Sequence, residues 1–313
     1  MVTSLKKIFV SPQIPGNAAG FIDGNFVVVD LRAGRSGMSL EANAFTEIPD
    51  GLLLPGFDGQ NLHNLDQLAS LMQQTADAAG LGDKKRWSFA LPEGSARTVL
   101  ISLDSKPGNR RELDEIIGWK LDRAVGLPSS SLRISRRRLT PARGQERYLV
   151  TVSPESVILE YEELFKKLGW HVGLILAKHM GEAEWLLTNT APGDKMLVSV
   201  NPAGFISIIT RKGEPVLIRS EECEHESIPD ELFRITLFYR DRLSDPTASR
   251  TITQVLVIGR MDRPQVLHSV AEALGNDPEL VNSAQLGLDL SGEPVSFDQL
   301  AAPAGLAALA WQN

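Results

Sequence analysis

The stretch from Trp87 to Val172 decides the fold, and its first half reads WSFALPEGSARTVLISLDSKPGNRRELDEIIGWKLDRAVGLP (residues 87–128). Two apolar runs, 88–91 and 98–103, flank a Pro-Glu-Gly turn and predict two strands. The period then changes to 3.6 residues, which predicts a helix from Arg111 to the stop at Gly126. Its first turn is acidic, where the helix dipole favours negative charge.

The second half of the stretch reads SSSLRISRRRLTPARGQERYLVTVSPESVILEYEELFKKLGWHV (residues 129–172). Two further apolar runs precede a helix predicted from Pro154 to about Leu168. Its apolar stripe is the cleanest periodic signal in the chain and consists of Val157, Ile158, Tyr161, Leu164, Phe165 and Leu168. The order strand, helix, strand, strand, helix predicts a small α+β unit inside a longer chain.

Several short segments of this stretch resemble the insertion subdomain of the PilM family. They are ALPE at 90–93, RTVL at 97–100, VSPESVILEYE at 152–162 and LGWHV at 168–172, followed downstream by EAEWLL at 182–187 and APAGLA at 302–307. PilM proteins are actin-like cytoplasmic components of type IV pilus assembly and are related to the cell-division protein FtsA. The resemblance lies in the order of these segments along the chain.

The resemblance implies an α/β chain with an actin-like (ribonuclease H-like) two-lobed fold and an FtsA/PilM-type α+β insertion subdomain. The first lobe would comprise residues 1–92, completed by 172–190 and 300–313, the insertion 93–171 and the second lobe 191–299. Asp23-Gly24 joins two apolar runs, which is a strong hairpin signal. A second apolar pair flanks residues 201–204, and this weak duplication is typical of the actin-like fold.

In nucleotide-binding members of the actin superfamily, the two hairpin turns hold phosphate and a third turn approaches adenosine. The resemblance places these turns at Asp23, Gly24 and Asn25, at Ser199, Asn201 and Gly204, and at Gly259. The second turn lacks its aspartate, Pro202 removes a backbone donor beside it, and Arg260 follows the third-turn glycine. We therefore predict a pseudo-ATPase without a bound cofactor, with ATP and Mg²⁺ as the alternative.

The composition excludes several other functions. A net charge of −7 argues against a nucleic-acid partner, because nonspecific affinity for DNA needs excess Lys and Arg. The five histidines show no metal-ligand spacing, so we predict no metal site. Cys223 lies in an acidic run that raises a thiol pKa, which predicts an unreactive cysteine. No leader pattern and no apolar run of membrane-spanning length occur, so a cytoplasmic location is predicted.

Two features are candidates for binding a partner. Arg136, Arg137 and Arg138 belong to a basic run that could face an acidic partner or lipid head groups, or could be a solvated strand edge whose charges discourage pairing. Trp119 lies off the apolar stripe of its helix, either as a partner contact or packed on the subdomain sheet. The resemblance implies a groove walled by residues 112–124, 87–91 and 132–139.

The resemblance predicts a scaffold of the inner-membrane assembly platform of type IV pili. Such a chain binds the cytoplasmic N-terminal segment of a PilN-like bitopic membrane protein, and possible further partners are other platform and motor proteins. It would contact the inner membrane only through these partners. The alternatives are a nucleotide-binding ATPase or sugar-kinase-like member of the actin superfamily, and a GspL-like cytoplasmic component of type II secretion.

Overall fold

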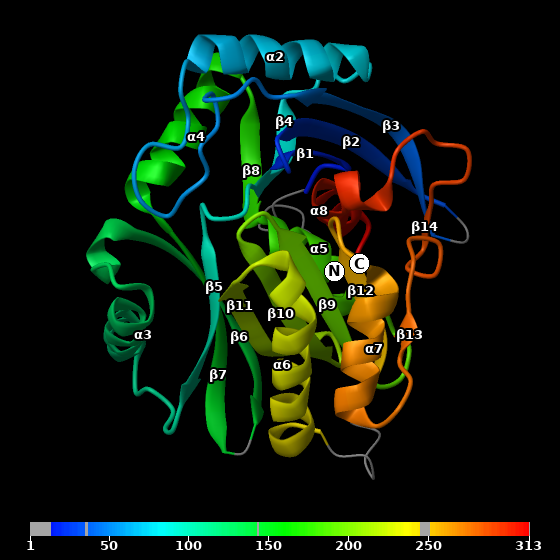
Figure 1. Ribbon diagram of the computed structural model, residues 1–313. Helices are drawn as coiled ribbons and strands as arrows, with labels where there is room; N and C mark the ends of the chain where they lie inside the picture. The colour runs from blue at the N-terminus through cyan, green and yellow to red at the C-terminus, as the bar shows by residue number, and fades with distance from the viewer. Residues whose placement is uncertain (1–13, 35–36, 143, 245–250, 313) are drawn as a thin grey trace, which may run out of the picture.

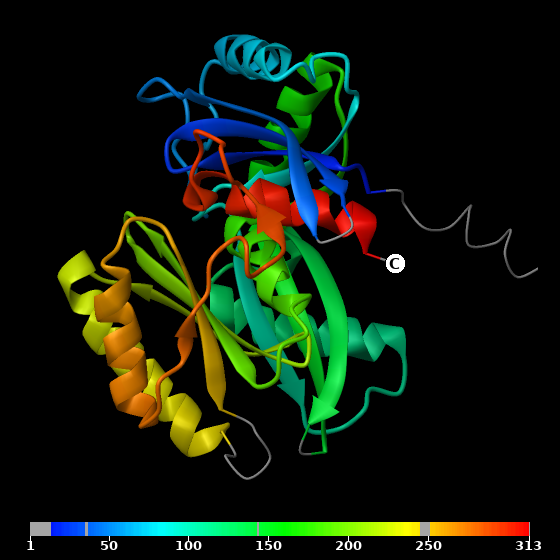
Figure 2. The same cartoon turned by 90° about the vertical axis from the view of Figure 1, so that its right-hand side faces the viewer.

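The computed structural model describes residues 14–34, 37–142, 144–244 and 251–312. The strands of these residues form three separate sheets (Figure 1). Two sheets and their helices make two lobes, and the third sheet lies beside the second lobe beneath the first (Figure 2).

The first sheet has six strands in the order β14-β3-β2-β1-β4-β8. Their bounds are β1 (Asn17–Ile22), β2 (Asn25–Ala33), β3 (Met38–Glu47), β4 (Arg86–Leu91), β8 (His171–Ala177) and β14 (Leu288–Asp289). Strands β3, β2 and β1 are antiparallel, whereas β1, β4 and β8 run parallel. The parallel strand β8 forms one edge of this sheet.

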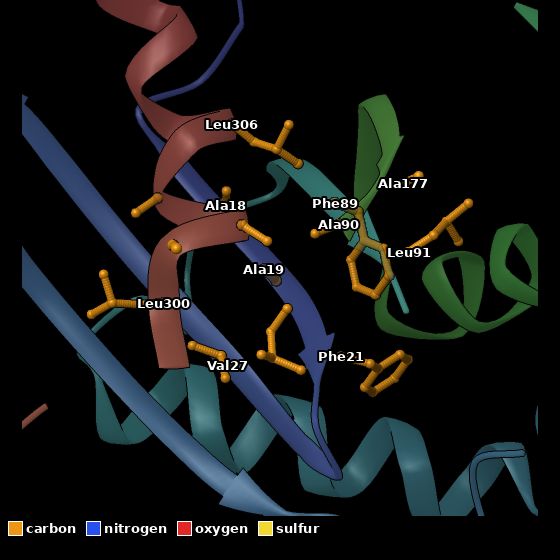
Figure 3. Close-up of a cluster of buried hydrophobic side chains, with 14 of the residues drawn as sticks. Ala18, Ala19, Phe21, Val27, Phe89, Ala90, Leu91, Ala177, Leu300 and Leu306 are labelled. Atoms are coloured by element: carbon orange, nitrogen blue, oxygen red, sulfur yellow. The ribbon is translucent and has the colours of Figure 1, made fainter. Parts of the chain in front are cut away.

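The two faces of the first sheet differ in side-chain size. Aromatic rings of β1 and β4 pack on α4 (Glu155–Leu168), with Phe21 5.5 Å from Phe89 and Phe89 4.8 Å from Phe165 between ring centroids. The helix α2 (Leu65–Ala78) packs beside α4. Small residues such as Ala18 and Ala90 face α8 (Phe297–Ala308), as Figure 3 shows. Small side chains let this apolar helix lie close to the strands.

The helix α5 (Lys178–Leu187) follows β8 directly and crosses α8 at two glycines. A Cβ atom on Gly305 would lie 1.9 Å from the carbonyl oxygen of Gly181, so neither helix tolerates a larger residue at the crossing. The indole nitrogen of Trp185 donates a hydrogen bond of 2.8 Å to the carbonyl of Ala301. These contacts hold α5 against α8.

The second sheet has the order β11-β10-β9-β12-β13. Its strands are β9 (Asp194–Asn201), β10 (Gly204–Arg211), β11 (Glu214–Glu222), β12 (Ile252–Ile258) and β13 (Glu279–Leu280). The helices α6 (Ile228–Arg242) and α7 (Arg263–Leu274) pack together and share a core with this sheet. Both predicted hairpins are present, β1-β2 and β9-β10, one in each lobe.

The third sheet has the order β5-β7-β6 and shares no strand with the first, as predicted for an insertion. Its elements are β5 (Arg97–Leu103), α3 (Arg110–Val125), β6 (Leu132–Ala142) and β7 (Gln145–Pro154). The predicted insertion also contained α4, but the buried side chains of α4 belong to the core of the first sheet. Because α4 connects β7 to β8 across that sheet, we assign it to the first lobe.

Candidate functional site

The first hairpin turn lines a cavity between the lobes. Asp23 and Gly24 have φ angles of 46° and 81°, which makes a two-residue turn of the primed kind. The cavity has a volume of about 400 Å³. Its walls come from the hairpin, from β3, from the loop after β12 and from the start of α8, with Asp23, Asn25, Phe45, Gly259, Arg260 and Asp298 among the lining residues. The predicted first and third turns therefore meet at one site.

A buried lysine lies beside this hairpin turn. Lys178 begins α5 with a side chain 1% exposed, and its Nζ is 3.4 Å from a carboxylate oxygen of Asp23 and 3.4 Å from one of Glu182. Glu182 is fully buried. Burial would lower the pKa of Lys178, but the carboxylates of Glu182, Asp23 and Glu93 raise it above its ordinary value. The ammonium group therefore keeps its charge inside the protein.

A second acidic side chain of the cavity is also paired. Both carboxylate oxygens of Asp298 accept hydrogen bonds of 2.7 Å from Arg263 at the start of α7. Burial raises the pKa of Asp298, although Arg263 and Lys178 oppose the shift. The cavity thus presents carboxylates that already have cationic partners from the chain.

The second hairpin turn does not reach the cavity. Among the described residues that line the cavity, none comes from 194–211. Asn201 caps its own turn by accepting a hydrogen bond of 2.9 Å from the amide of Ala203, and its carbonyl contacts His225 at 3.1 Å. A Cβ atom on Gly204 would lie 2.1 Å from the carbonyl oxygen of Glu221, so this glycine serves the packing of β10 on β11. Ser199 is buried within the sheet.

Gly259 also has a structural reason to be glycine. Its φ angle is 102°, and a Cβ atom there would lie 2.7 Å from the carbonyl oxygen of Val200 on β9. The close neighbour is therefore a strand of the same lobe. Of the three predicted turns, the structure brings Asp23, Asn25 and Gly259 together and leaves Ser199, Asn201 and Gly204 apart.

The arginine run on β6 is not a single basic patch. Because side chains alternate along a strand, Arg136 and Arg138 lie on one face of the third sheet and Arg137 lies on the other. The three arginines therefore do not share one surface, and the alternation of side chains along a strand already indicated this in the sequence.

The arginines of β6 also have acidic neighbours. Arg136 pairs with Asp114 of α3, Arg138 pairs with Glu146 at 2.7 Å, and Arg137 lies close enough to Glu184 of α5 to oppose the rise of its pKa. Burial nevertheless raises the pKa of Glu184 to about 7. The basic run is thus largely compensated within the molecule.

Trp119 of α3 is 58% exposed, and the guanidinium carbon of Arg123 lies 5.1 Å from the centroid of its ring. Of the two alternatives for this residue, packing on the subdomain sheet is wrong. An exposed indole on the outer face of α3 is available for contact with another molecule.

A groove runs beside β8, at one edge of the first sheet. Its volume is about 390 Å³, and its lining includes Trp87, Phe165, Trp170, Val172 and Gly173. The rings of Trp87 and Trp170 are stacked with centroids 4.3 Å apart. The groove is also lined by Glu162 of α4, which pairs at 3.2 Å with Arg133 of β6. This ion pair links the groove lining, which belongs to the first lobe, to the insertion.

Of the predicted walls, only Trp87 lines this groove, and none of the described lining residues comes from 112–124 or 132–139. Residues 87–91 form β4, which is hydrogen-bonded to β1 on one side and to β8 on the other, so it offers no free edge. The strand at the edge of the sheet, which lines the groove, is β8. The sequence alone did not show this, because β8 pairs with β4 across more than 80 residues of chain.

Glu93, His179 and Thr98 form a hydrogen-bonded series that was not predicted. Nδ1 of His179 is 3.0 Å from the Glu93 carboxylate, and Nε2 is 2.9 Å from the Thr98 hydroxyl. This order resembles an acid, base and nucleophile, but His179 is 1% exposed and Thr98 9%. None of the three lines the interlobe cavity or the β8 groove. The series therefore ties α5 to the root of the insertion.

Comparisons with known proteins bear on the fold. The sequence matches no protein-family model and no curated protein. Among solved structures, it is similar to a chain of the PilM-PilN type IV pilus biogenesis complex, with a TM-score of 0.75 and 16% identity over 96% of this chain and 100% of that chain. The chain has the actin-like fold.

A second neighbour of this actin-like chain is a Bacteroides thetaiotaomicron protein of unknown function. It is described as having an actin-like ATPase fold, and it matches with a TM-score of 0.53 and 11% identity over all of both chains. The predicted fold class is confirmed by these two neighbours. The described residues contain no helix long and apolar enough to span a membrane.

Proposed function

We propose that this chain is a PilM-like scaffold of a type IV pilus assembly platform that binds the cytoplasmic N-terminal segment of a PilN-like bitopic membrane protein. The observation that carries the proposal is the likeness over nearly the whole chain to a protein of the PilM-PilN complex. Such a scaffold is held at the inner membrane by its partner. On this proposal the chain is cytoplasmic and peripheral to that membrane.

The β8 groove supports this function by its chemistry. An extended peptide gains affinity from main-chain hydrogen bonds along a free strand edge and specificity from pockets for alternate side chains. The edge of β8 supplies main-chain groups for such hydrogen bonds, and Trp170 and Phe165 form the floor of an apolar pocket. Residues 133–138 of the edge strand β6 are all exposed or half-buried but lie outside the groove lining, and Arg133 connects to it through its ion pair with Glu162.

We further propose that the chain does not use ATP. A metal-nucleotide site of this fold needs backbone donors and an uncompensated carboxylate. Here Pro202 lacks a donor, the second turn is not among the described residues that line the cavity, and a carboxylate oxygen of Asp23 lies 3.4 Å from the ammonium group of Lys178. Isothermal calorimetry with millimolar Mg-ATP should therefore show no binding heat. Nucleotide carried through purification would contradict this and would favour the ATPase alternative.

Gly173 allows a direct test of the peptide site. Nothing lies within 4 Å of a Cβ atom placed on this exposed residue of β8, so a side chain there enters the groove without disturbing the fold. We expect Gly173→Trp to abolish binding of a labelled N-terminal PilN-like peptide in fluorescence anisotropy. Gly173→Ala is the matched control and should bind like the wild type. Equal affinity of all three proteins would exclude the groove, and no binding by the wild type would overturn the proposed function.

A further inference from the structure

The burial of Lys178 is unusual in two respects. Its Nζ has no hydrogen-bond partner among the described residues, and neither do the two carboxylate oxygens of Glu182. Lys178 is also the first residue of α5, where the helix dipole disfavours a positive charge, and the preceding Ala177 offers no side-chain cap. A cation placed against both burial and the dipole needs strong compensation from anions.

The compensation comes from three separate segments. Asp23 is in the β1-β2 turn, Glu182 lies one helical turn along α5, and Glu93 follows β4. One carboxylate oxygen of Asp23 and one of Glu182 each lie 3.4 Å from Nζ of Lys178, so these two oxygens are no further apart than twice that distance. Without the ammonium group, the buried carboxylate of Glu182 would lose its cationic partner, with the carboxylate of Asp23, which is 45% exposed, still beside it. Removal of the cation from a buried carboxylate is strongly destabilising.

We infer that Asp23 and Glu182 form a binding site for a primary ammonium cation, which the chain fills with its own Lys178. The bound ammonium group joins the first hairpin turn to α5 and thereby fixes one wall of the interlobe cavity. The inference rests on the proposed function in one respect: it takes that cavity to hold no metal-nucleotide. Because the cation is covalently attached, the hairpin needs no ion from solution.

A cation site differs from an ordinary buried ion pair because it should bind a free ammonium ion once the lysine side chain is shortened. Truncation of Lys178 to alanine removes three methylene carbons and the nitrogen, which are the atoms of n-propylammonium. The emptied space would match this molecule in length and charge. Binding of n-propylammonium to the folded state alone would raise the midpoint of thermal unfolding by mass action.

The experiment measures thermal unfolding of Lys178→Ala with n-propylammonium chloride or with tetramethylammonium chloride at equal ionic strength. We expect a lowered midpoint in plain buffer and recovery of at least half the loss in tens of millimolar n-propylammonium. Tetramethylammonium, which has no N–H donor and is bulkier around its nitrogen, should not restore it. The wild type should respond to neither salt beyond the effect of ionic strength.

A second variant separates the cation site from a general effect of amines. Lys178→Ala/Glu182→Gln removes one carboxylate, so its midpoint should gain nothing from n-propylammonium. If Lys178→Ala does not fold in plain buffer, refolding yield with and without n-propylammonium replaces the midpoint. Equal rescue by the two salts, no rescue by either, or rescue of the double variant would each overturn the inference. None of these outcomes depends on whether a PilN-like peptide binds.

Discussion

The interlobe cavity and the β8 groove have nearly the same volume, about 400 and 390 Å³. They differ in whether the chain itself supplies partners for their polar groups. In the cavity, Asp23 and Asp298 have cationic partners supplied by the chain itself. In the groove, an edge strand lies beside an aromatic floor, and none of the described residues forms a further strand paired to it. The difference indicates that size does not decide which hollow binds a ligand. On the proposed function, the strand edge beside the groove does.

The largest expected effect comes from removing the buried ion pair beside the interlobe cavity. Lys178→Met leaves Glu182 buried without its ammonium partner, and removal of one member of a buried ion pair costs about 3–5 kcal/mol of unfolding free energy. Chemical denaturation measures the loss. The double variant Lys178→Met/Glu182→Gln carries neither charge and should recover most of it. A single variant as stable as the wild type would show that the cavity is not held by this pair.

The next effect concerns Glu184 of α5, which lies near Arg137 of β6. Burial raises its pKa to about 7, above its value in the unfolded chain. The protonated Glu184 is compatible with burial, so the native state keeps its full stability below the unfolded pKa of this group. That contribution to the free energy of unfolding is lost as the pH rises through about 7, where the buried carboxylate ionises. We expect Glu184→Gln to be more stable than the wild type at pH 8, by on the order of 2 kcal/mol, and no more stable at pH 4.

Denaturation at the two pH values checks the Glu184 prediction. The exposed Glu163 of α4 supplies the matched control, because Glu163→Gln should change stability little at either pH. A Glu184→Gln stability gain that is the same at both pH values would contradict the assigned titration.

A smaller effect tests how far the partner extends from the groove. We propose that Trp119 contacts the partner at the margin of its footprint, since the side chain is exposed and lies outside the groove lining. Exposed marginal residues contribute less than buried central ones, so Trp119→Ala should weaken peptide binding by about 1 kcal/mol. Anisotropy measures this beside Gly173→Trp. A larger loss for Trp119→Ala would move the centre of binding to α3.

The smallest effect concerns the charge of β6. Arg137→Glu should weaken binding by less than about 1 kcal/mol and mainly slow association, because charges at the rim of an interface act on encounter. The difference from the wild type should shrink between low and high salt. Arg138→Gln, on the opposite face of the strand, is the control. A salt-independent loss for Arg137→Glu would instead indicate a buried contact.

Local patterns were sufficient to predict much of the fold. The Asp23-Gly24 turn, the helices at 110–125 and 155–168 and the separate sheet of the insertion were predicted from residues close in sequence. The site was harder because its partners are far apart. Lys178 meets Asp23 across 155 residues, and only its i,i+4 spacing from Glu182 was visible in the sequence. The membership of α4 in the first lobe likewise depends on a crossover between strands.

Hydrogen–deuterium exchange with and without the PilN-like peptide compares the two regions in one measurement. Our account predicts slower exchange of amides in β8 (residues 171–177) when the peptide is bound, because a new strand would pair with this edge. Amides of the first hairpin turn (residues 22–25) and of residues 259–260 should exchange at unchanged rates. Protection of the turn and of residues 259–260, with β8 unchanged, would place the ligand in the interlobe cavity and contradict the account.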